Sequence, residues 1–514
     1  MGNNPTMFFL LNSLDIHRGG VTKSSLMQAN LFAEKGYKTF IVTFNFNPRY
    51  SEILEELVTL GKLNPEVTFL NMYDSLKGQK PSVPEQEIPI LKRINAENLI
   101  LDPHHGKNAD RVYDNGEYIA YIKYDDNGSV VFIDHFNRSR YRTMREEYDA
   151  RGHLLKISYM DYEANKARQM LFYDEEGTSY LSKWVNPETG SAIRVNHFKA
   201  GKLQKIFSND VELKTSWLES VIEQQGDPIV VSDVRAIDPI LLKLDGTKTK
   251  KVWRLHSNHV GAPFDPMGDF EKTVAPCLTA IDELDAALVL TREQQEDLTE
   301  KMGPKANLFT LPHYTETQKK TWLSSIKSDD PDKDENLAVV ITRFAKLKQI
   351  DHIVKAFRKV VDTKPEAKLE LWGYGDEEAS LKKLIRDLKL SANVTIKGFT
   401  FEPTKVYSQA LFSILTSKTE GFSLGILESM ASGTPVISYD IKYGPQDMIS
   451  NGENGLIVEK GNIDDLAAKM TWMFDHPKEG IKFGKKAHKS ITEQFSKDKY
   501  WDNWMSVIHY VMKK

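Results

Sequence analysis

The sequence lacks three features that would each point to a particular class of protein. It holds one cysteine, Cys277, in 514 residues, so no disulfide can form within the chain, as is usual in a reducing compartment. The apolar stretch at residues 7–11 is far too short to span a bilayer, and no other run approaches that length. Lys and Arg number 68 against 72 Asp and Glu, so general attraction to nucleic acid is not indicated. We expect a soluble cytoplasmic protein.

The length of the chain predicts two or three domains, and its first part alternates like an α/β domain. Residues 7–12 predict a buried parallel strand, residues 22–35 a helix and residues 39–44 a second strand. The polar loop after the first strand contains Gly19-Gly20. Because ligands bind at the carboxyl ends of parallel strands, this loop is a candidate binding site.

From about residue 112 to 206 the pattern changes to short aromatic and β-branched runs separated by turn dipeptides. In one run Tyr118, Ala120, Ile122 and Tyr124 alternate along the chain, so they would share one face of a strand. This pattern predicts an antiparallel meander inserted in the first α/β domain. Turns are expected at Asn115-Gly116, Asn127-Gly128, Arg151-Gly152, Glu176-Gly177, Thr189-Gly190 and Ala200-Gly201.

Strands and helices alternate again after the meander. Strands are expected at 229–231, 251–255, 287–290 and 308–311 and, beyond a charged linker at 327–335, at 337–342, 368–372, 394–396, 412–415, 435–438 and 455–458. The acidic Asp330-Pro331-Asp332 in the linker is expected to be solvated. The last helix carries an apolar stripe, which we expect to face the core rather than a membrane: Trp501, Trp504, Met505 and Ile508.

The strongest chemical signal is the segment 420–428, EGFSLGILE, which follows a predicted strand and opens a helix. Gly421 permits close backbone approach, and the free N–H groups around Ser423 would bind phosphate. Glu420 and Glu428 lie on either side of that phosphate site and suit two different hydroxyl-bearing groups. Their separation disfavours a paired-carboxylate hydrolase. The alternative is a capped helix with two solvated glutamates.

Other loops expected at strand ends add cations, glycines and a histidine. Arg343 and Lys348 follow the first strand of the second α/β series and could neutralise a diphosphate, although such residues are usually solvated. Arg18-Gly19-Gly20 precedes a helix without the G-x-G-x-x-G spacing of nicotinamide-binding folds. His256, in the run His256-Ser257-Asn258-His259, suits contact with a sugar better than metal binding, with a structural role left open. Gly373-Tyr374-Gly375 and Gly398 also lie in loops expected at strand ends.

These motifs together resemble the family 4 retaining glycosyltransferases. Three further stretches are similar to the wall teichoic acid α-glycosyltransferases of the TarM and TagE type: DIHRGGVTKS at 15–24, HSNH at 256–259 and DIKYGPQD at 440–447. The resemblance implies an α/β protein of the GT-B fold, with two Rossmann-like domains facing a cleft and an antiparallel β-rich insertion in the N-terminal domain. The expected domains are 1–74 and 211–325 (N-terminal, acceptor side), 75–210 (insertion, oligomerisation and acceptor binding), 326–495 (nucleotide-sugar binding) and 496–514 (a helix packing back toward the N-terminal domain).

The resemblance also implies a role for each residue that matches the motifs. Arg343 and Lys348 would hold the diphosphate of a UDP-sugar, and Glu428 the ribose. Glu420 would contact the transferred sugar and stabilise positive charge at its anomeric carbon, and His256 would contact the sugar. Gly19 and Gly20 would approach the diphosphate from the opposite domain. The remaining expected donor-binding residues are Gly398, Gly421, Phe422, Ser423 and Leu424.

The resemblance further implies that the acceptor attacks the face of the sugar from which the phosphate leaves. Such a reaction needs neither a nucleophilic carboxylate nor a metal, and no cofactor is expected beyond the UDP-sugar donor. The expected partners are an anionic polyol-phosphate polymer, to be met at the inner face of the membrane, and further copies of the chain in a homotrimer. Glucose or N-acetylglucosamine as the sugar, and ribitol or glycerol in the acceptor, stay open. The alternatives are a protein O-glycosyltransferase acting on serine-rich adhesins, a non-catalytic glycan-binding or chaperone subunit, and a scaffold whose functional part is the β insertion.

Overall fold

The computed structural model describes residues 4–16, 19–78, 94, 99–104, 106–315 and 333–513. The chain forms two compact units, Met1–Lys251 and Val252–Lys514. Arg18 and the acidic run at 330–332 lie outside the described residues. The end of the predicted linker, from Lys333 onward, is described.

The first unit contains a parallel sheet whose strand order is β14-β1-β2-β3. Every residue of β1 is buried, which explains why this strand reads as an uninterrupted apolar run. Because β2 and β14 flank β1, the strand order reverses there, and the loop holding Gly19 and Gly20 follows β1. The elements are β1 (Thr6–Leu11), α1 (Gly20–Glu34), β2 (Thr39–Thr43), α2 (Tyr50–Thr59), β3 (Thr68–Asn71), α3 (Met72–Lys77), α5 (Asp210–Ile222), β14 (Pro228–Ser232), η1 (Arg235–Ile237) and α6 (Asp238–Lys243).

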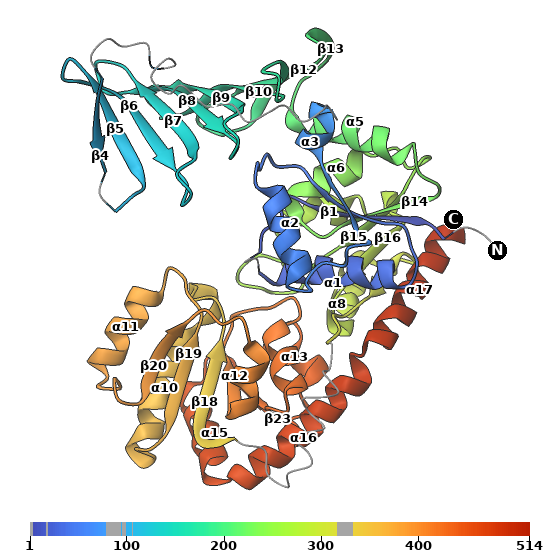
Figure 1. The fold of residues 1–514 in the computed structure, drawn as a ribbon. Helices are drawn as coiled ribbons and strands as arrows, with labels where there is room; N and C mark the ends of the chain where they lie inside the picture. The colour runs from blue at the N-terminus through green and yellow to red at the C-terminus, as the bar shows by residue number, and fades with distance from the viewer. Residues whose placement is uncertain are drawn as a thin grey trace. The chain divides into compact units, whose positions relative to one another are not determined.

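The same unit carries an antiparallel sheet whose strands follow one another in chain order, as the turn signals predict (Figure 1). Each expected turn dipeptide lies between successive strands and carries positive φ at its glycine. Buried Lys183 ties the sheet to the α/β layer, since its Nζ donates to the Tyr73 hydroxyl (2.7 Å) and pairs with Asp210 (2.5 Å). The strands are β4 (Leu99–Pro103), β5 (Ala109–Asp114), β6 (Glu117–Tyr124), β7 (Val130–Phe136), β8 (Arg142–Tyr148), β9 (Leu154–Asp161), β10 (Lys166–Tyr173), β11 (Ser179–Val185), β12 (Ala192–Lys199) and β13 (Lys202–Phe207).

The second unit begins with parallel strands in the order β17-β16-β15. The C-terminal helix packs here: Tyr500 lies against Tyr314 (ring centroids 4.7 Å apart) and Tyr510 against Phe309 (5.1 Å). Trp504 is fully buried, so the stripe on this helix faces the core. The elements are β15 (Lys250–Arg254), α7 (Ala275–Thr279), η2 (Ile281–Glu283), β16 (Ala286–Val289), α8 (Arg292–Met302), β17 (Leu308–Thr310) and α17 (Lys497–Lys513).

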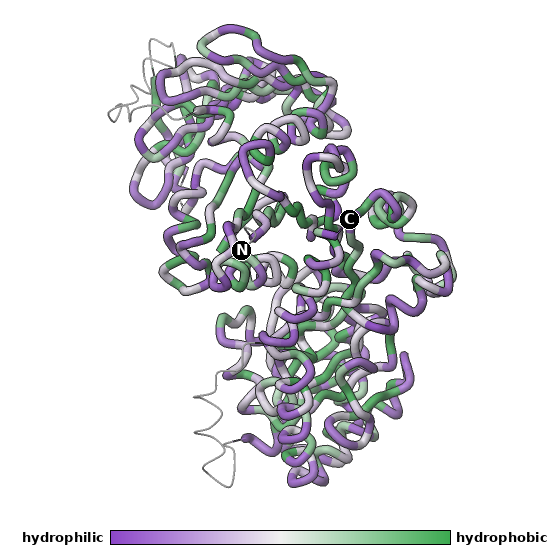
Figure 2. Tube along the Cα trace, turned by 90° about the vertical axis from the view of Figure 1, so that its right-hand side faces the viewer, coloured by the Kyte–Doolittle hydropathy of each residue, from purple (hydrophilic) through white to green (hydrophobic). Residues whose placement is uncertain are grey.

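A six-stranded parallel sheet completes the second unit, in the order β20-β19-β18-β21-β22-β23. Hydrophobic stretches run along the inner strands, and hydrophilic stretches predominate in peripheral loops (Figure 2). Its elements are β18 (Asp334–Ile341), η3 (Lys346–Lys348), α10 (Ile350–Thr363), β19 (Lys368–Trp372), α11 (Glu378–Asp387), β20 (Val394–Gly398), α12 (Pro403–Gln409), β21 (Ala410–Leu415), α13 (Leu424–Ala431), β22 (Val436–Tyr439), α14 (Pro445–Met448), β23 (Gly455–Val458), α15 (Ile463–Asp475) and α16 (Pro477–Gln494).

One expectation about the linker is wrong. Asp334 and Glu335, predicted to belong to a solvated linker, are the first residues of β18, and Asp334 pairs with Ala410 of β21. Charged side chains are compatible with a strand here because both are exposed at the amino end of β18, before its buried stretch at 338–340.

Candidate active site

The strand order of the six-stranded sheet places two predicted site loops side by side. After β18 the chain goes outward to β19 and β20, and then returns to add β21 on the other side of β18. The loops that leave the carboxyl ends of β18 and β21 therefore meet at a topological switch point, where open parallel sheets bind ligands. Hydrogen bonds join them: the Thr416 hydroxyl donates to the carbonyl of Lys348 (3.0 Å), and Lys418 N–H donates to that of Leu347 (2.8 Å).

Lys348 and Glu420 form an ion pair in this position. Lys348 Nζ lies 2.6 Å from Glu420 Oε1, and the Ser417 hydroxyl donates to the same oxygen at 2.6 Å. Both charged side chains are largely buried, with 20% and 14% of their surface exposed. Because a partly buried pair is screened less than a surface pair, it fixes the Glu420 carboxylate firmly. The site therefore holds an ammonium group and a carboxylate side by side.

Arg343 lies in the loop after β18 and is exposed. Two glycines allow this loop to lie close against the loop after β19: a Cβ at Gly373 would stand 1.9 Å from the Thr342 carbonyl oxygen, and one at Gly375 2.3 Å from that of Phe344. Both glycines have φ above +140°, a conformation that side chains rarely adopt. These contacts fix the backbone on both sides of Arg343, which is itself exposed.

The helix that follows the glutamate motif, α13, has an open amino end beside a cavity. Ser423, with φ of +71°, is its N-cap and makes no side-chain cap hydrogen bond. The cavity is lined by Thr342, Lys348, Tyr407, Ser417 and Gly425, among others. Free N–H groups, the helix dipole and a lysine ammonium together favour an anion in this place.

Glu428 lies one turn inside α13 and is half-buried. Its carboxylate is close enough to the phenol of Tyr407 to act on it: the pKa of Tyr407 is raised well above its ordinary value, first by complete burial and then by the charge of Glu428. Among the other expected donor-binding residues, Phe422 is buried, Leu424 is the first residue of α13, and Gly398 ends β20, where its carbonyl accepts from Gly373 N–H (2.7 Å).

The structure also brings His256 to the glutamate loop. A Cβ at Gly421 would stand 2.2 Å from the His256 carbonyl oxygen, so the two backbones are in direct contact. The His256 ring stacks on His313 (5.3 Å), whose edge meets Phe422 (5.4 Å). Gly19 and Gly20 are exposed at the start of α1 in the other unit, and their approach to this site stays a prediction.

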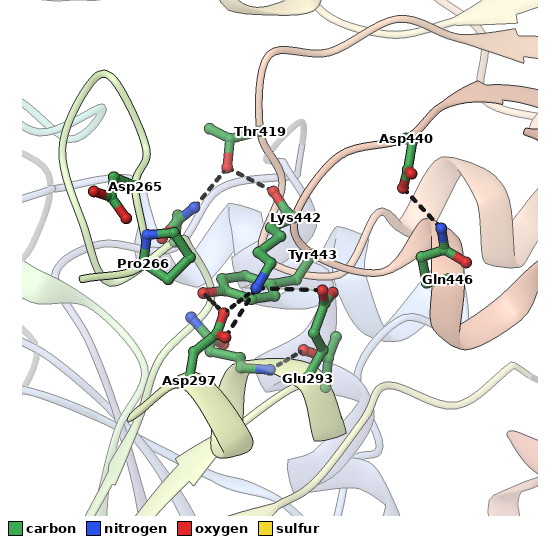
Figure 3. A network of polar contacts seen from close by, with 12 residues as sticks. Asp265, Pro266, Glu293, Asp297, Thr419, Asp440, Lys442, Tyr443 and Gln446 are labelled. Atoms are coloured by element: carbon green, nitrogen blue, oxygen red, sulfur yellow. Dashed lines mark hydrogen bonds and ion pairs between the residues drawn. The ribbon is translucent and has the colours of Figure 1, made fainter. Parts of the chain in front are cut away.

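Sequence reasoning missed a polar network that supports the glutamate loop (Figure 3). Asp297 on α8 accepts from the Tyr443 hydroxyl (2.7 Å) and from Lys442 Nζ (2.7 Å), and Lys442 also lies 3.4 Å from Glu293. His259 Nδ1 lies 3.3 Å from the Tyr443 hydroxyl. Only the stretch 440–447, singled out by resemblance, pointed toward Lys442 and Tyr443. Nothing in the sequence indicated Asp297, which lies on an ordinary polar helix.

Burial sets the protonation of this network. It raises the pKa of Glu293 and lowers the pKa of His259, which favours neutral imidazole. Burial, followed by the hydrogen bond to Asp297, raises the pKa of Tyr443 far above its ordinary value, so its hydroxyl stays a donor. For Lys442 burial acts to lower the pKa, but Asp297 and Glu293 outweigh it and the net direction is upward.

Two features, a metal-binding group and a membrane-spanning helix, are absent from the described residues. Within the described ranges, no group of three or more His, Cys, Asp or Glu residues is arranged to hold a metal ion. Among the helices that the structure describes, none combines the length and the hydrophobicity of a membrane span.

Comparison with known proteins agrees with this geometry. The family Glycosyl transferases group 1 matches residues 324–490, and Glycosyl transferase 1 domain A matches residues 8–198. The poly(glycerol-phosphate) alpha-glucosyltransferase of Bacillus subtilis is 27% identical, with 98% of this chain and 75% of that protein covered. The poly(ribitol-phosphate) alpha-N-acetylglucosaminyltransferase of Staphylococcus aureus is also 27% identical, with 98% and 99% covered.

A crystal structure of a mutant of S. aureus TarM with fondaparinux, alpha-GlcNAc-glycerol and UDP superimposes with a TM-score of 0.87, at 26% identity over 98% of this chain and 99% of that one. The chain is a glycosyltransferase of the GT-B fold, and its residues 324–490 match the group 1 glycosyltransferases. Within that group it stands close to the wall teichoic acid α-glycosyltransferases, which it resembles over nearly its full length.

Proposed function

We propose that this enzyme transfers glucose or N-acetylglucosamine from a UDP-sugar to hydroxyl groups of a poly(polyol-phosphate) wall teichoic acid, with retention of the anomeric configuration. The observation that carries the proposal is the Lys348–Glu420 pair at the switch point, beside the open amino end of α13. The alignment of 98% of this chain with each of the two polyol-phosphate relatives supports the acceptor class.

Each residue then has a separate task toward the donor. Lys348, with the exposed guanidinium of Arg343 and the N–H groups at the start of α13, binds the diphosphate. Glu428 binds the ribose hydroxyls, because it lies one turn further along the same helix. Gly19 and Gly20, exposed around the start of α1, offer backbone that a phosphate can approach closely.

The reaction breaks the bond between the anomeric carbon and the β-phosphate oxygen and forms a bond from that carbon to the acceptor oxygen on the same face. The acceptor proton passes to the departing phosphate oxygen, so UDP leaves with the electron pair. Lys348 and Arg343 stabilise the charge that develops on the phosphate, and Glu420 the charge that develops on the sugar. His256 contacts the sugar from its loop beside Gly421. No metal or further cofactor takes part in this scheme.

The β-rich insertion is proposed to join copies of the chain into a homotrimer and to help bind the polymer at the inner face of the membrane. Both edge strands of the meander expose apolar side chains: Ile100 (60% exposed) and Leu101 on β4, and Leu203 (51%) and Ile206 on β13. Open edges with apolar side chains favour pairing with another chain. Light scattering of the purified protein tests this assembly, and a monomer would contradict it.

The deciding experiment is a donor–acceptor screen with the purified enzyme. UDP-glucose and UDP-N-acetylglucosamine, each radiolabelled, are offered with poly(ribitol-phosphate), poly(glycerol-phosphate) or a serine-rich adhesin peptide. We expect label in a polyol-phosphate polymer, insensitive to EDTA, and much less label with Glu420→Gln. Label only in the peptide would overturn the acceptor class, and no transfer with any pair would overturn the proposal.

A further inference from the structure

The helix α8 faces the proposed active site with a row of polar side chains. Asp297 follows Glu293 by four residues and Gln294 by three, so it is a neighbour of both on the helix surface. Gln294 Nε2 donates to the carbonyl of Ser257 (2.9 Å), next to His256. Asp297 accepts from both Lys442 and Tyr443 (Figure 3). One helix therefore contacts the loop of His256 and the segment beside Glu420.

Lys442 and Tyr443 hold Glu420 through their backbones while their side chains hold Asp297. Glu420 N–H donates to the Lys442 carbonyl (3.1 Å), and Tyr443 N–H donates to the Glu420 carbonyl (2.9 Å). The Lys442 carbonyl also accepts from the Thr419 hydroxyl (2.7 Å). Any shift of Lys442 and Tyr443 is thus transmitted to the backbone of Glu420 on both sides of its Cα.

The histidine loop is fastened to the same residues. Asn258 Nδ2 donates to the Thr419 hydroxyl oxygen (2.8 Å), and the ring of His259 stacks on Tyr443 with centroids 5.9 Å apart. The Asp297 carboxylate is well shielded, with 13% of its side chain exposed. A shielded carboxylate with two donors, one of them charged, makes strong and directional bonds.

We propose that Asp297 is a positioning residue for sugar transfer: by holding Lys442 and Tyr443 it fixes Glu420 relative to the His256 loop. Asp297 touches neither donor nor acceptor in this scheme. It acts on the turnover step, because a shift of about 1 Å in a reacting group can lower the rate on the order of 100-fold. Donor affinity rests instead on Lys348, Arg343 and Glu428. The inference rests on the proposed function.

The test compares Asp297→Asn and Tyr443→Phe with the wild-type enzyme and a control, Asp282→Asn, which removes an exposed carboxylate paired with Lys305. Steady-state kinetics with the preferred UDP-sugar and acceptor give kcat and KM. We expect kcat to fall roughly 10- to 100-fold in both variants while the donor KM changes less than about threefold. The control keeps wild-type values.

The double variant, which combines Asp297→Asn with Tyr443→Phe, decides how Asp297 acts. If Asp297 works through Tyr443, the loss in kcat of the double variant is smaller than the product of the two single losses. Wild-type kcat in a stably folded Asp297→Asn, or multiplicative losses, would overturn the inference. Slow UDP-sugar hydrolysis without acceptor is measured in parallel. If the wild-type enzyme hydrolyses donor but glycosylates no polymer, the proposed acceptor is wrong while the role of Asp297 is still decided on hydrolysis.

Discussion

The backbones of Gly421 and His256 touch: a Cβ at position 421 would lie 2.2 Å from the His256 carbonyl oxygen and 2.9 Å from the Ser257 Cα. Both obstacles are backbone atoms, which cannot rotate aside as a side chain can. The glycine in the motif is therefore required by the neighbouring loop as well as by any ligand. Because Glu420 precedes Gly421 directly, this contact also fixes the distance between the backbones of Glu420 and His256.

Gly421→Ala should separate the two loops and lower transfer more than about 100-fold, since the reacting groups would move apart by an ångström or more. Initial rates at saturating donor measure this loss. Gly226→Ala is the matched control, because no atom lies within 4 Å of a Cβ there. Wild-type activity in Gly421→Ala would show that the loops do not need this spacing.

Lys348→Met should weaken UDP binding, because the substitution removes a cation that is proposed to bind the diphosphate. It also removes the cation beside the Glu420 carboxylate, which keeps its hydrogen bond from the Ser417 hydroxyl. Turnover should fall about 100- to 1,000-fold, as for loss of one transition-state stabilising group. Calorimetry with UDP measures the affinity. An unchanged UDP affinity would remove Lys348 from the diphosphate site.

Glu420→Gln should leave UDP affinity near that of the wild type and lower kcat, since the amide cannot offset positive charge on the sugar. If Glu420 and Lys348 act as a pair, the double variant loses less than the two single variants together. Titration with UDP and steady-state rates on the same preparations separate binding from turnover. Additive losses would show that the pair does not function as a unit.

Asp447→Asn should stabilise the protein at pH 8. Burial, and then the nearby Glu293 and Glu296, raise the pKa of Asp447 to about 6. Between the unfolded value, about 4, and 6 the folded state binds more protons, so the free energy of unfolding falls as pH rises through this window and stays lower above it. After allowance for solvent screening we expect a gain of about 1 kcal/mol at pH 8 and none near pH 4.

Urea unfolding at several pH values measures the effect of Asp447→Asn. The asparagine oxygen can still accept from the Arg292 N–H that the aspartate contacts, so the helix α8 keeps this partner. Asp362→Asn, an exposed carboxylate paired with Arg358, serves as the control. A stability difference that is the same at pH 4 and pH 8 would contradict the assignment to Asp447 ionisation.

Lys333→Met should stabilise the protein near pH 6. Burial lowers the pKa of Lys333 to about 7, although Nζ donates to the Ala410 carbonyl (2.8 Å) and the Thr434 hydroxyl (2.7 Å). Between 7 and the unfolded value, about 10.4, the unfolded state binds more protons, so the free energy of unfolding rises with pH. We expect the variant to gain about 1–3 kcal/mol near pH 6 and to lose that advantage by pH 10.

The control for Lys333→Met is Lys368→Met, in which an exposed lysine near Asp334 is replaced. Thermal melts of both variants and the wild type across pH 6–10 give the comparison. The prediction is wrong if the melting temperature of the wild type does not rise relative to that of Lys333→Met between pH 7 and pH 9. Burial of the Lys333 ammonium would then not lower the stability of the fold.

The sequence predicted the strands well because their signals are local. Uninterrupted apolar runs marked the parallel strands, and a glycine at each predicted turn marked the meander. The turns between β7 and β8 and between β9 and β10 went unpredicted, since the residues with positive φ there are Arg140 and Asn165 rather than glycine. The start of β18 was misassigned because Asp334 and Glu335 are charged, and only pairing with β21 makes them part of a strand.

For the site, residue types were easier to predict than contacts. The motif around Glu420 and the cations after β18 carry recognisable chemistry, and the strand order brings Lys348 to Glu420 as expected for two loops at one sheet edge. Asp297 could not be found in this way. It lies 145 residues from Lys442, and its function depends on which face of α8 meets that loop, which no local pattern encodes.

The strand order of the six-stranded sheet has a consequence for biosynthesis. β18 gains β19 and β20 on one side as the chain emerges, but β21 must later close the other side before Lys348 meets Glu420. Pairing of strands so distant in sequence is slow compared with local folding. Donor nucleotide present during refolding should therefore act late, by trapping molecules in which β21 has already docked, and leave the early assembly of β18–β20 unaffected.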